Sequence, residues 1–485
     1  MLDLDRKDLF CQKAFVGGIW YEGRDEAFLS VSNPADGSLV GRVPALGTDD
    51  VTRAVDAAAD AFRSFRKWTA KERSQVLQRW AALMLRHKQD LARIMTVEQG
   101  KPLGEAVGEI EYAASFLEWF GEEVKRCYGD TIPANRTDQR ITVIRQPVGV
   151  CAAITPWNFP SAMITRKVAP ALAAGCTIVV KPAAQTPFSA LALCVLAEEA
   201  GVPPGVLSVV TGNAAVIGAT LTESEVVRKL SFTGSTAVGK RLMAACAGTV
   251  KKLSLELGGN APFIVFDDAD IDKAVAAAMA SKFRNTGQTC VCANRFLVQS
   301  GIHDAFVARM TEAVAKLKCG PGMDAGVTLG PLIDEAALGK VTELVADAVS
   351  QGATIRAGGQ SLDAGSCFYA PTILTGVRDS MAIAQDEIFG PVVAISTFSS
   401  EDEAIEMANA TRFGLAAYFF TSDLNRSIRV TEALDFGMVG VNEGIISNEV
   451  APFGGIKESG FGKEGSRYGL DEYAERKYVC LGNVV

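Results

Sequence analysis

Residues 282–292, which read KFRNTGQTCVC, combine types and spacing that could carry out covalent chemistry. Cys290 follows a glycine and two polar residues, and Arg284 lies six positions upstream. In a modestly electropositive setting a cysteine ionises to a thiolate, which is well suited to attack a carbonyl carbon at neutral pH. The alternative is inert packing, because cysteine is a common core residue and this chain has 11.

Two carboxylates are candidate acid–base groups. Glu256 is flanked by leucines at the end of an apolar stretch, where burial would raise its pKa toward a value useful for a general base. A Glu256 that accepts hydrogen bonds from nearby backbone amides is an equal alternative. Glu387 lies beside Phe389 and a turn, and that segment read alone predicts only a loop.

Composition narrows the class of protein. A length of 485 residues predicts two or three domains, and 48% hydrophobic with 21% charged residues is typical of a soluble globular protein. The net charge of −8 disfavours nucleic acid and anionic membranes as partners. The two histidines, His87 and His303, have no metal-ligand spacing, so no metal site is expected. Scattered cysteines and the absence of a signal-like amino terminus favour the cytoplasm.

Residues 148–257 alternate between short apolar runs and helical patterns. Strands are predicted at 149–154, 177–180, 206–210, 229–232 and 253–255, and helices near 163–174, 187–200, 214–222 and 236–247. This alternation predicts a parallel sheet with right-handed crossovers, whose ligands bind outside the carboxyl ends of the strands. A second series, with strands at 261–266 and 295–299 and helices near 270–284 and 302–317, predicts a second α/β domain.

Other segments are less regular. The first 130 residues are expected to be mainly helical after a short opening segment, and Thr69 with Glu72 forms a capping-box pattern. Residues 141–145 alternate like a half-exposed strand that could pair outside its own domain, including with another subunit. The glycine-rich residues 453–465 are expected to form a surface loop.

Unusual residues follow the predicted strands at 155–160, 181–183 and 232–236. The last of these is a turn of small residues at the start of a helix, which can seat a phosphate. It lacks the GxGxxG fingerprint, so a simple strand–turn–helix junction is the alternative. Lys181, at the same edge of the predicted sheet, offers a cation for ribose or phosphate oxygens.

Six motifs follow one another along the chain: PWNFP at 156–160, KPA at 181–183, FTGS at 232–235, ELGG at 256–259, GQTC at 287–290 and EIFGP at 387–391. Together they resemble the motif set of the aldehyde dehydrogenase superfamily over essentially the whole chain. The resemblance implies an α/β fold with two parallel-sheet domains, a Rossmann-like NAD(P)-binding domain (1–125 and 148–258) and a catalytic domain (259–457). It also implies a small oligomerisation element (126–147 and 470–485), consistent with a homodimer or homotetramer.

The resemblance also implies roles for individual residues. Cys290 would attack an aldehyde to give a thiohemiacetal, Asn158 would hold its oxyanion, and Glu256 would activate the water that hydrolyses the later thioester. The implied cofactor contacts are Thr155, Pro156, Trp157, Lys181, Ala183, Ala184, Gly234, Ser235, Glu387 and Phe389. Among these, Lys181 and Glu387 match positions that hold the ribose rings, and Phe389 one beside the nicotinamide.

Within the family, the chain is most similar to members that oxidise succinic semialdehyde to succinate, in residues 163–167, 282–285, 290–292 and 444–447. The far carboxylate of this substrate needs a fixed, bidentate cation. The resemblance implies that Arg166 and Arg284 grip it and that Ser447 donates a further hydrogen bond. A solvated charge or structural ion pair is the alternative for either arginine. Cys292, which can form a disulfide with Cys290 in this family, is a candidate redox switch, with packing as the equal alternative.

The expected cofactor is NADP, with NAD also accepted. Ala184 stands where NAD-preferring relatives often carry a glutamate that would repel a 2′-phosphate, although alanine cannot bond that phosphate itself. Oxidation of glutarate semialdehyde, or of carboxylated aldehydes more broadly, is an alternative because one methylene is worth only about 1–3 kcal/mol. A non-catalytic binding protein on the same fold is the alternative outside enzymes.

Overall fold

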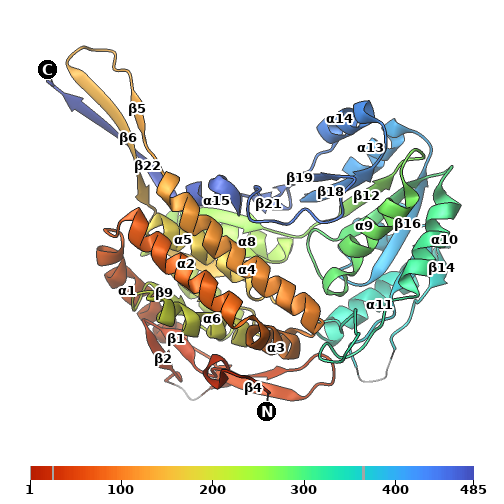
Figure 1. The fold of residues 1–485 in the computed structure, drawn as a ribbon, viewed down its shortest axis with the longest axis horizontal. Coiled ribbons are helices and arrows are strands. Elements are labelled where there is room, and N and C mark those ends of the chain that lie inside the picture. The colour runs from red at the N-terminus through yellow and green to blue at the C-terminus, as the bar shows by residue number, and fades with distance from the viewer. Residues whose placement is uncertain (1, 25–26, 363–365, 485) are drawn as a thin grey trace.

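The computed structural model of the chain describes residues 2–24, 27–362 and 366–484. In this part the backbone forms an eight-stranded, a seven-stranded and a three-stranded sheet and two two-stranded ribbons. Figure 1 shows the two large sheets side by side in the body of the molecule and the three-stranded sheet projecting from it as an arm.

The described strands are β1 (Ala14–Val16), β2 (Ile19–Tyr21), β3 (Phe28–Ser32), β4 (Leu39–Pro44), β5 (Asp130–Ile132), β6 (Gln139–Pro147), β7 (Val150–Ile154), β8 (Thr177–Lys181), β9 (Leu207–Val209), β10 (Val227–Thr233), β11 (Lys252–Glu256), β12 (Ala261–Val265), β13 (Ala293–Gln299), β14 (Thr354–Ala357), β15 (Thr372–Thr375), β16 (Val392–Phe398), β17 (Phe413–Gly414), β18 (Ala416–Phe420), β19 (Met438–Val441), β20 (Ile456–Lys457), β21 (Gly460–Phe461) and β22 (Ala474–Gly482). The helices are α1 (Thr48–Phe65), α2 (Ala70–Arg86), α3 (Lys88–Gln99), α4 (Leu103–Glu123), α5 (Ala162–Ala174), α6 (Pro187–Ala200), α7 (Ala214–Glu223), α8 (Thr236–Cys246), α9 (Ile271–Phe283), α10 (His303–Val314), α11 (Glu335–Ser350), α12 (Ala382–Gln385), α13 (Glu401–Asn409), α14 (Leu424–Ala433) and α15 (Ser466–Asp471). Short 3₁₀ turns cover Lys7–Leu9, Val124–Arg126, Ala247–Thr249 and Arg284–Gly287.

The eight-stranded sheet has the order β2-β1-β9-β8-β7-β10-β11-β21, and its strands from β9 to β11 are parallel. The chain passes from β7 outward through β8 to β9 and then returns to add β10 and β11 on the other side of β7. The strand order therefore reverses between β7 and β10. In open α/β sheets, ligands bind in the crevice at the carboxyl ends of the strands at such a reversal.

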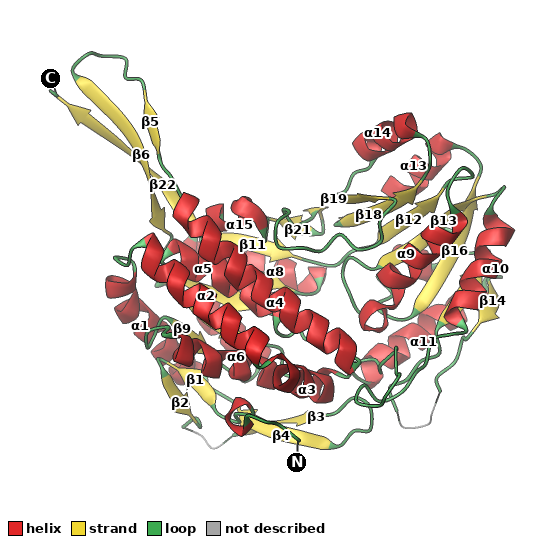
Figure 2. Ribbon diagram, in the orientation of Figure 1, coloured by secondary structure: helices red, strands yellow, loops and turns green. Residues whose placement is uncertain are grey.

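Helices cover both faces of this sheet, which is why its strands are apolar without strict alternation. Cys151 and Ala153 of β7 face the core formed with α2 to α6, whereas Val150 and Ala152 face the core formed with α1 and α7. Figure 2 shows α2, α4 and α5 crossing the same side of the sheet. The sheet edge that carries the strand ends is thereby held rigidly between two packed layers.

The seven-stranded sheet has the order β14-β15-β16-β13-β12-β18-β19 and is parallel except for β14 at its edge. Helices α9 and α10 pack on one face, and α13 and α14 on the other. The connection from α9 to β13 contains residues 284–292. Strand β21 returns from this part of the chain to the first sheet, where it pairs antiparallel with β11.

The arm consists of β5, β6 and β22. Strand β6 pairs antiparallel with β22 from Gln139 opposite Gly482 to Pro147 opposite Ala474, and with β5 on its other side. The strand predicted at 141–145 is therefore present, and its partners within this chain come from residues far apart in the sequence.

The expected strands and helices between 148 and 317 correspond to β7–β13 and α5–α10 with small differences at their ends. The capping box of Thr69 and Glu72 at the start of α2 is also confirmed. The helices expected within the first 130 residues are present as α1–α4, after an opening segment of four strands in which β1 extends the first sheet by pairing with β9. One expectation is wrong. Residues 453–465 do not form a simple surface loop, because β21 pairs with β11 and Gly454 is buried. No helix of the described residues is long and apolar enough to cross a membrane.

Candidate active site

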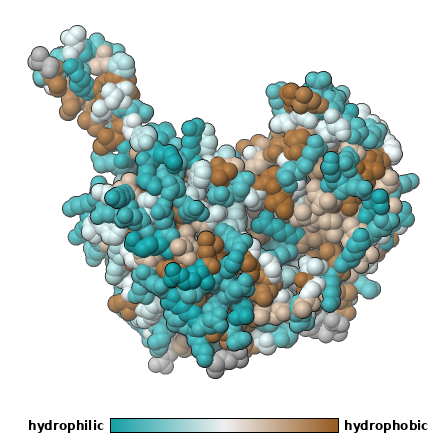
Figure 3. All heavy atoms as spheres, in the orientation of Figure 1, coloured by the Kyte–Doolittle hydropathy of each residue, from teal (hydrophilic) through white to brown (hydrophobic). Residues whose placement is uncertain are grey.

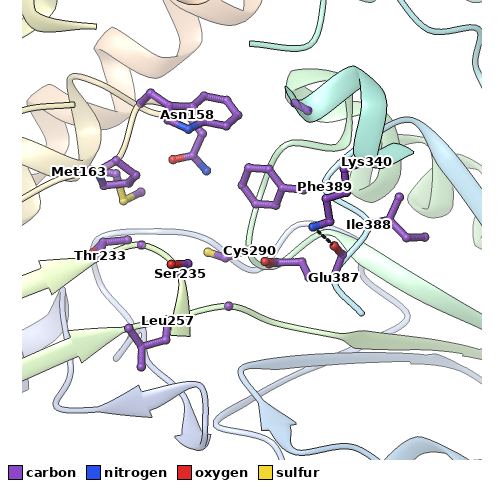
Figure 4. Close-up of a pocket in the computed structure, with 15 residues that line it drawn as sticks. Asn158, Met163, Thr233, Ser235, Leu257, Cys290, Lys340, Glu387, Ile388 and Phe389 are labelled. Carbon is purple, nitrogen blue, oxygen red and sulfur yellow. Dashed lines mark hydrogen bonds between the residues drawn. The ribbon is translucent and has the colours of Figure 1, made fainter. Parts of the chain in front are cut away.

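A cavity of about 270 Å³ lies where the carboxyl edge of the first sheet faces loops of the second α/β unit (Figure 4). Its lining is Pro156, Trp157, Asn158, Met163, Thr233, Gly234, Ser235, Leu257, Gly258, Cys290, Ala337, Lys340, Glu387, Ile388 and Phe389. Eight of the residues singled out from the sequence therefore meet in this cavity. The others lie outside this lining: Thr155, Arg166, Lys181, Ala183, Ala184, Glu256, Arg284, Cys292 and Ser447.

Cys290 follows a stretch of unusual backbone. Asn285 and Thr286 have positive φ values of 49° and 59°, and Gly287 follows with 76°. Non-glycine residues rarely adopt this conformation, and it persists where surrounding contacts enforce it. Here the Asn285 side-chain amide donates to the backbone oxygens of Asn158 at 2.9 Å and Gln288 at 3.3 Å. This strained segment, which precedes Cys290, is thus hydrogen-bonded to the turn that carries Asn158.

Asn158 follows β7 and is only 5% exposed. Its Nδ2 donates to the backbone oxygen of Gln288 at 2.9 Å. An amide carries two N–H groups, so one donor remains for an oxygen formed beside Cys290. Figure 4 shows the Asn158 amide and the Cys290 thiol facing the same cavity. This arrangement suits the oxyanion-holding role expected from the sequence.

The charges around Cys290 do not depress its pKa, contrary to the expectation of an electropositive setting. Burial, and then the negative charge of Glu387, raise the pKa of the Cys290 thiol to about 12, although Arg166 acts in the opposite direction. These surroundings therefore favour the neutral thiol of Cys290 near pH 7. It must lose its proton as part of the reaction.

Glu387 and Phe389 form the wall opposite Asn158. The Glu387 carboxylate accepts the backbone N–H of Gly259 at 3.0 Å, and burial raises its pKa to about 7. Lys340 Nζ donates to the Glu387 backbone oxygen at 2.5 Å. The Phe389 ring packs edge-on against Trp157, with centroids 5.6 Å apart. The flat ring of Phe389 and the Glu387 carboxylate, whose pKa is near neutral, thus face the cavity together.

Glu256 ends β11 behind the cavity. It is 2% exposed, and neither carboxylate oxygen has a hydrogen-bond partner in the described residues. Burial, and then the nearby Glu464, raise its pKa well above the usual value. A Cβ atom on Gly454 would come within 2.7 Å of Glu256 Oε1, so the glycine-rich segment gives this carboxyl its space. The alternative that backbone amides satisfy Glu256 is wrong for the described residues.

Residues suited to a dinucleotide surround the strand ends. Ser235 caps α8, where its Oγ accepts the backbone N–H of Val238 at 3.4 Å, and Gly234 precedes it in the turn. Lys181 is 4% exposed, its ammonium has no acceptor among the described residues, and burial lowers its pKa to about 8. Ala184 is exposed and brings no negative charge. A phosphorylated nucleotide fits this site, because Lys181 is a buried cation without a partner among the described residues, α8 presents its N-terminus, and Ala184 brings no carboxylate.

The three proposed substrate residues also meet. Arg166, Arg284 and Ser447 line a narrow cavity of about 20 Å³ together with Cys290. The Arg284 guanidinium lies 4.7 Å from the Phe159 ring centroid and has no carboxylate partner in the described part of the chain. A cavity of this volume holds about one water molecule, so a four-carbon substrate requires side chains to shift.

Arg166 differs from Arg284. It is 1% exposed, pairs with Glu464, and stacks 4.0 Å from the Phe453 ring centroid. The structural ion pair that was the alternative for this arginine is therefore present. Arg166 still lines the cavity beside Cys290, and of the two guanidiniums only that of Arg284 lacks a direct ion pair among the described residues.

Cys292 is buried, and its thiol donates to the backbone oxygens of Ala293 at 3.4 Å and Lys282 at 3.6 Å. Both Cys290 and Cys292 are free thiols here. Cys290 lines the cavity whereas Cys292 is bonded inside the loop, so a disulfide between them requires the loop to rearrange.

Some residues of the site were not found from the sequence. Lys101, Glu109 and Asn285 bond to the turn that carries Asn158, and Glu464 pairs with both Arg166 and Lys167. The only local signal was the glycine-rich setting of Glu464. The others depend on contacts between residues more than 50 positions apart.

Comparisons with known proteins agree with this geometry. The sequence profile of the aldehyde dehydrogenase family matches residues 20–479, and the chain belongs to this family. It is 59% identical to a glutarate-semialdehyde dehydrogenase of Pseudomonas aeruginosa, with all of both chains covered. It is 58% identical to the NADP(+) succinate-semialdehyde dehydrogenase of Escherichia coli, over 99% of this chain and 100% of that one. The crystal structure of succinate-semialdehyde dehydrogenase from Burkholderia pseudomallei superimposes with a TM-score of 0.98 at 56% identity, over 99% of this chain and 100% of that one. The chain is thus an NAD(P)-dependent oxidoreductase with the aldehyde dehydrogenase fold. This assignment excludes the alternative of a non-catalytic binding protein on the same fold.

Proposed function

We propose that this enzyme oxidises succinic semialdehyde to succinate, using NADP in preference to NAD. The observation that carries the substrate assignment is the unpaired Arg284 guanidinium in the cavity shared with Cys290 and Ser447. Arg284 is half-buried and has no carboxylate within ion-pair distance among the described residues, so the far carboxylate of a semialdehyde would offset part of the cost of removing this cation from water. An uncharged aldehyde would leave that cost in place.

In the proposed mechanism the Cys290 thiol gives up its proton to solvent, and the thiolate sulfur then bonds to the aldehyde carbon as the C=O π electrons move to oxygen. The resulting oxyanion accepts hydrogen bonds from Asn158 Nδ2 and the Cys290 backbone N–H. When bound, an oxidised nicotinamide dinucleotide supplies the hydride acceptor that converts the thiohemiacetal to a thioester. Glu256 then takes a proton from the water that hydrolyses the thioester. Its raised pKa makes it a strong base once ionised, so this step is favoured as pH rises.

The cofactor preference rests on the strand ends of the first sheet. Lys181 and the turn of Gly234 and Ser235 would hold the adenosine phosphate groups, Glu387 the nicotinamide ribose, and Phe389 with Pro156 and Trp157 the ring. The lack of a carboxylate at Ala184 admits a 2′-phosphate beside Lys181. Thr155 and Ala183 contribute backbone to this edge. The Escherichia coli relative is named for NADP(+), which supports this proposal.

The proposed division of the chain follows the sheets. Residues 1–125 and 148–258 would form the cofactor domain, 259–457 the catalytic domain, and 126–147 with 470–485 the oligomerisation element. The arm exposes Tyr478 at 63% and Leu481 at 52%, and Figure 3 shows hydrophobic residues along it. An arm with exposed apolar side chains favours a homodimer or homotetramer in the cytoplasm.

Steady-state kinetics with succinic semialdehyde, glutarate semialdehyde and propanal, each with NADP and NAD, test this proposal. We expect kcat/KM for the two semialdehydes to exceed that for propanal by about 10²-fold or more, because only they engage Arg284. Comparable kcat/KM for propanal would refute the substrate assignment. Glutarate semialdehyde remains the second candidate because the Pseudomonas aeruginosa relative bears that name. The ratio of the two semialdehydes decides between them.

A further inference from the structure

The backbone oxygen of Asn158 is held by two side chains from distant parts of the chain. Lys101 Nζ donates to it at 2.8 Å, and Asn285 Nδ2 donates to it at 2.9 Å. The same residue presents its side-chain amide to the cavity. The position of this amide is therefore fixed through its own backbone, from the side away from the cavity.

Lys101 is itself locked in place. It is 2% exposed, forms an ion pair with Glu109, and lies 4.1 Å from the Phe159 ring centroid. Glu109 is 3% exposed, and its Oε1 accepts the backbone N–H groups of Ser161 at 2.9 Å and Ala162 at 3.2 Å, where α5 begins. The ion pair thus fastens both sides of the turn that contains Asn158.

Stability alone does not account for a buried ion pair of this kind. Desolvating two charges offsets much of their attraction, and apolar residues of similar volume often serve a core equally well. Here the Lys101 ammonium donates to the backbone oxygen of residue 158, and the Glu109 carboxylate accepts the backbone N–H groups of residues 161 and 162. Catalysis is sensitive to the position of an oxyanion donor, since a displacement of about 1 Å can cost about 10²-fold in rate.

We propose that Lys101, held by Glu109, is a positioning residue that fixes the Asn158 amide for oxyanion stabilisation. This inference rests on the proposed role of Asn158. Lys101 acts through the Asn158 backbone oxygen and is not in the lining of the cavity that contains Cys290.

A double-mutant cycle tests the proposal. Lys101→Met with Glu109→Gln removes both charges and the donor to Asn158, while glutamine keeps an acceptor for the two N–H groups. We expect kcat to fall about 10- to 10²-fold in the wild-type background, with KM changed less than about threefold. In the Asn158→Ala background, which itself costs about 10²- to 10³-fold, the same pair of changes should cost less than about threefold.

The matched control is Lys251→Met. Lys251 is also a buried lysine that donates to a backbone oxygen, that of Val227 at 3.0 Å, but it lies in the connection before β11 and lines no cavity described here. Its loss should leave kcat within about twofold. Thermal unfolding of every variant shows whether activity changes accompany a loss of fold.

Equal losses of kcat with and without Asn158, or no loss in the wild-type background, would overturn the proposal. If the double variant does not fold, Lys101→Gln with Glu109→Gln is run through the same cycle with the same criterion. The cycle is measured with both succinic semialdehyde and propanal. If the wild type oxidises only propanal, the substrate assignment fails, and the cycle with propanal still decides the role of Lys101.

Discussion

Replacement of Arg284 by methionine should separate recognition of the substrate carboxylate from every other step. The Arg284 guanidinium lies over the Phe159 ring at 4.7 Å and has no ion pair among the described residues. Methionine keeps an apolar stem of similar length against that ring. The change therefore removes a charge and its donors with little disturbance of packing.

The expected magnitude follows from the bonds that Arg284 can make. A bidentate guanidinium–carboxylate contact comprises two charge-assisted hydrogen bonds, each worth about 1.5–3 kcal/mol. Taking about 3–4 kcal/mol for the pair, kcat/KM for succinic semialdehyde should fall about 10²- to 10³-fold. Propanal has no carboxylate, so its kcat/KM should change less than about threefold. Loss of the cation–π contact should cost only about 1–2 kcal/mol of stability.

The assay is steady-state kcat/KM for both aldehydes in the wild type, Arg284→Met and a control, Arg66→Met. Arg66 also lies over a phenylalanine ring, that of Phe62 at 5.2 Å, but on α1 away from the cavity. The control should retain both activities. Equal losses for the two aldehydes in Arg284→Met would show that Arg284 supports the fold or the loop and does not bind the carboxylate.

Three further outcomes are expected. Ala184→Glu should lower kcat/KM with NADP about tenfold or more and leave kcat/KM with NAD unchanged, because a carboxylate would face the 2′-phosphate. Equal effects on both cofactors would show that Ala184 is not part of the cofactor site. Peroxide inactivation should be reversed by dithiothreitol in the wild type but not in Cys292→Ala, as measured by recovered turnover, if the two thiols form a disulfide. Glu387→Gln should speed alkylation of Cys290 by iodoacetamide at pH 8, followed by intact mass, because a charge that raises the thiol pKa is gone; an unchanged rate would mean that burial alone sets that pKa.

The sequence predicted the parts of the fold that depend on local pattern. Between 148 and 317, short apolar strands alternate with helices, and each element is recognisable within its own residues. Strand β1 was not predicted, although it forms a local hairpin with β2 across Gly17 and Gly18. Its place in the large sheet depends on pairing with β9, almost 200 positions later. The glycine-rich segment was misread because its glycines are required both by close contacts with Ser254 and Glu256 and by positive φ values at Gly460 and Gly462. Composition alone does not distinguish these requirements from those of an exposed loop.

In the site, too, the residues that were predicted belong to local motifs, and those that were missed depend on long-range contacts. Cys290, Asn158 and Glu387 stand in motifs of contiguous residues, and the structure brings them to one cavity. The ion pair of Arg166 with Glu464 joins residues about 300 positions apart, and no local pattern announces it. For this reason the two arginines looked equivalent in the sequence, whereas in the described residues Arg166 has a direct ion pair and Arg284 has none.

The balance of charge around Cys290 explains why the nucleophile is inactive at rest. Arg166 favours the thiolate, but burial together with Glu387 and Glu256 outweighs it, so the thiol pKa is about 12. At pH 8 that value places the thiolate about 5 kcal/mol above the thiol. A substrate carboxylate at Arg284 adds negative charge and cannot lower this cost. The cost of forming the thiolate falls only if a ligand brings positive charge into the cavity or favours protonation of Glu387. The surroundings of Cys290 in this chain therefore favour the protonated form of its sulfur.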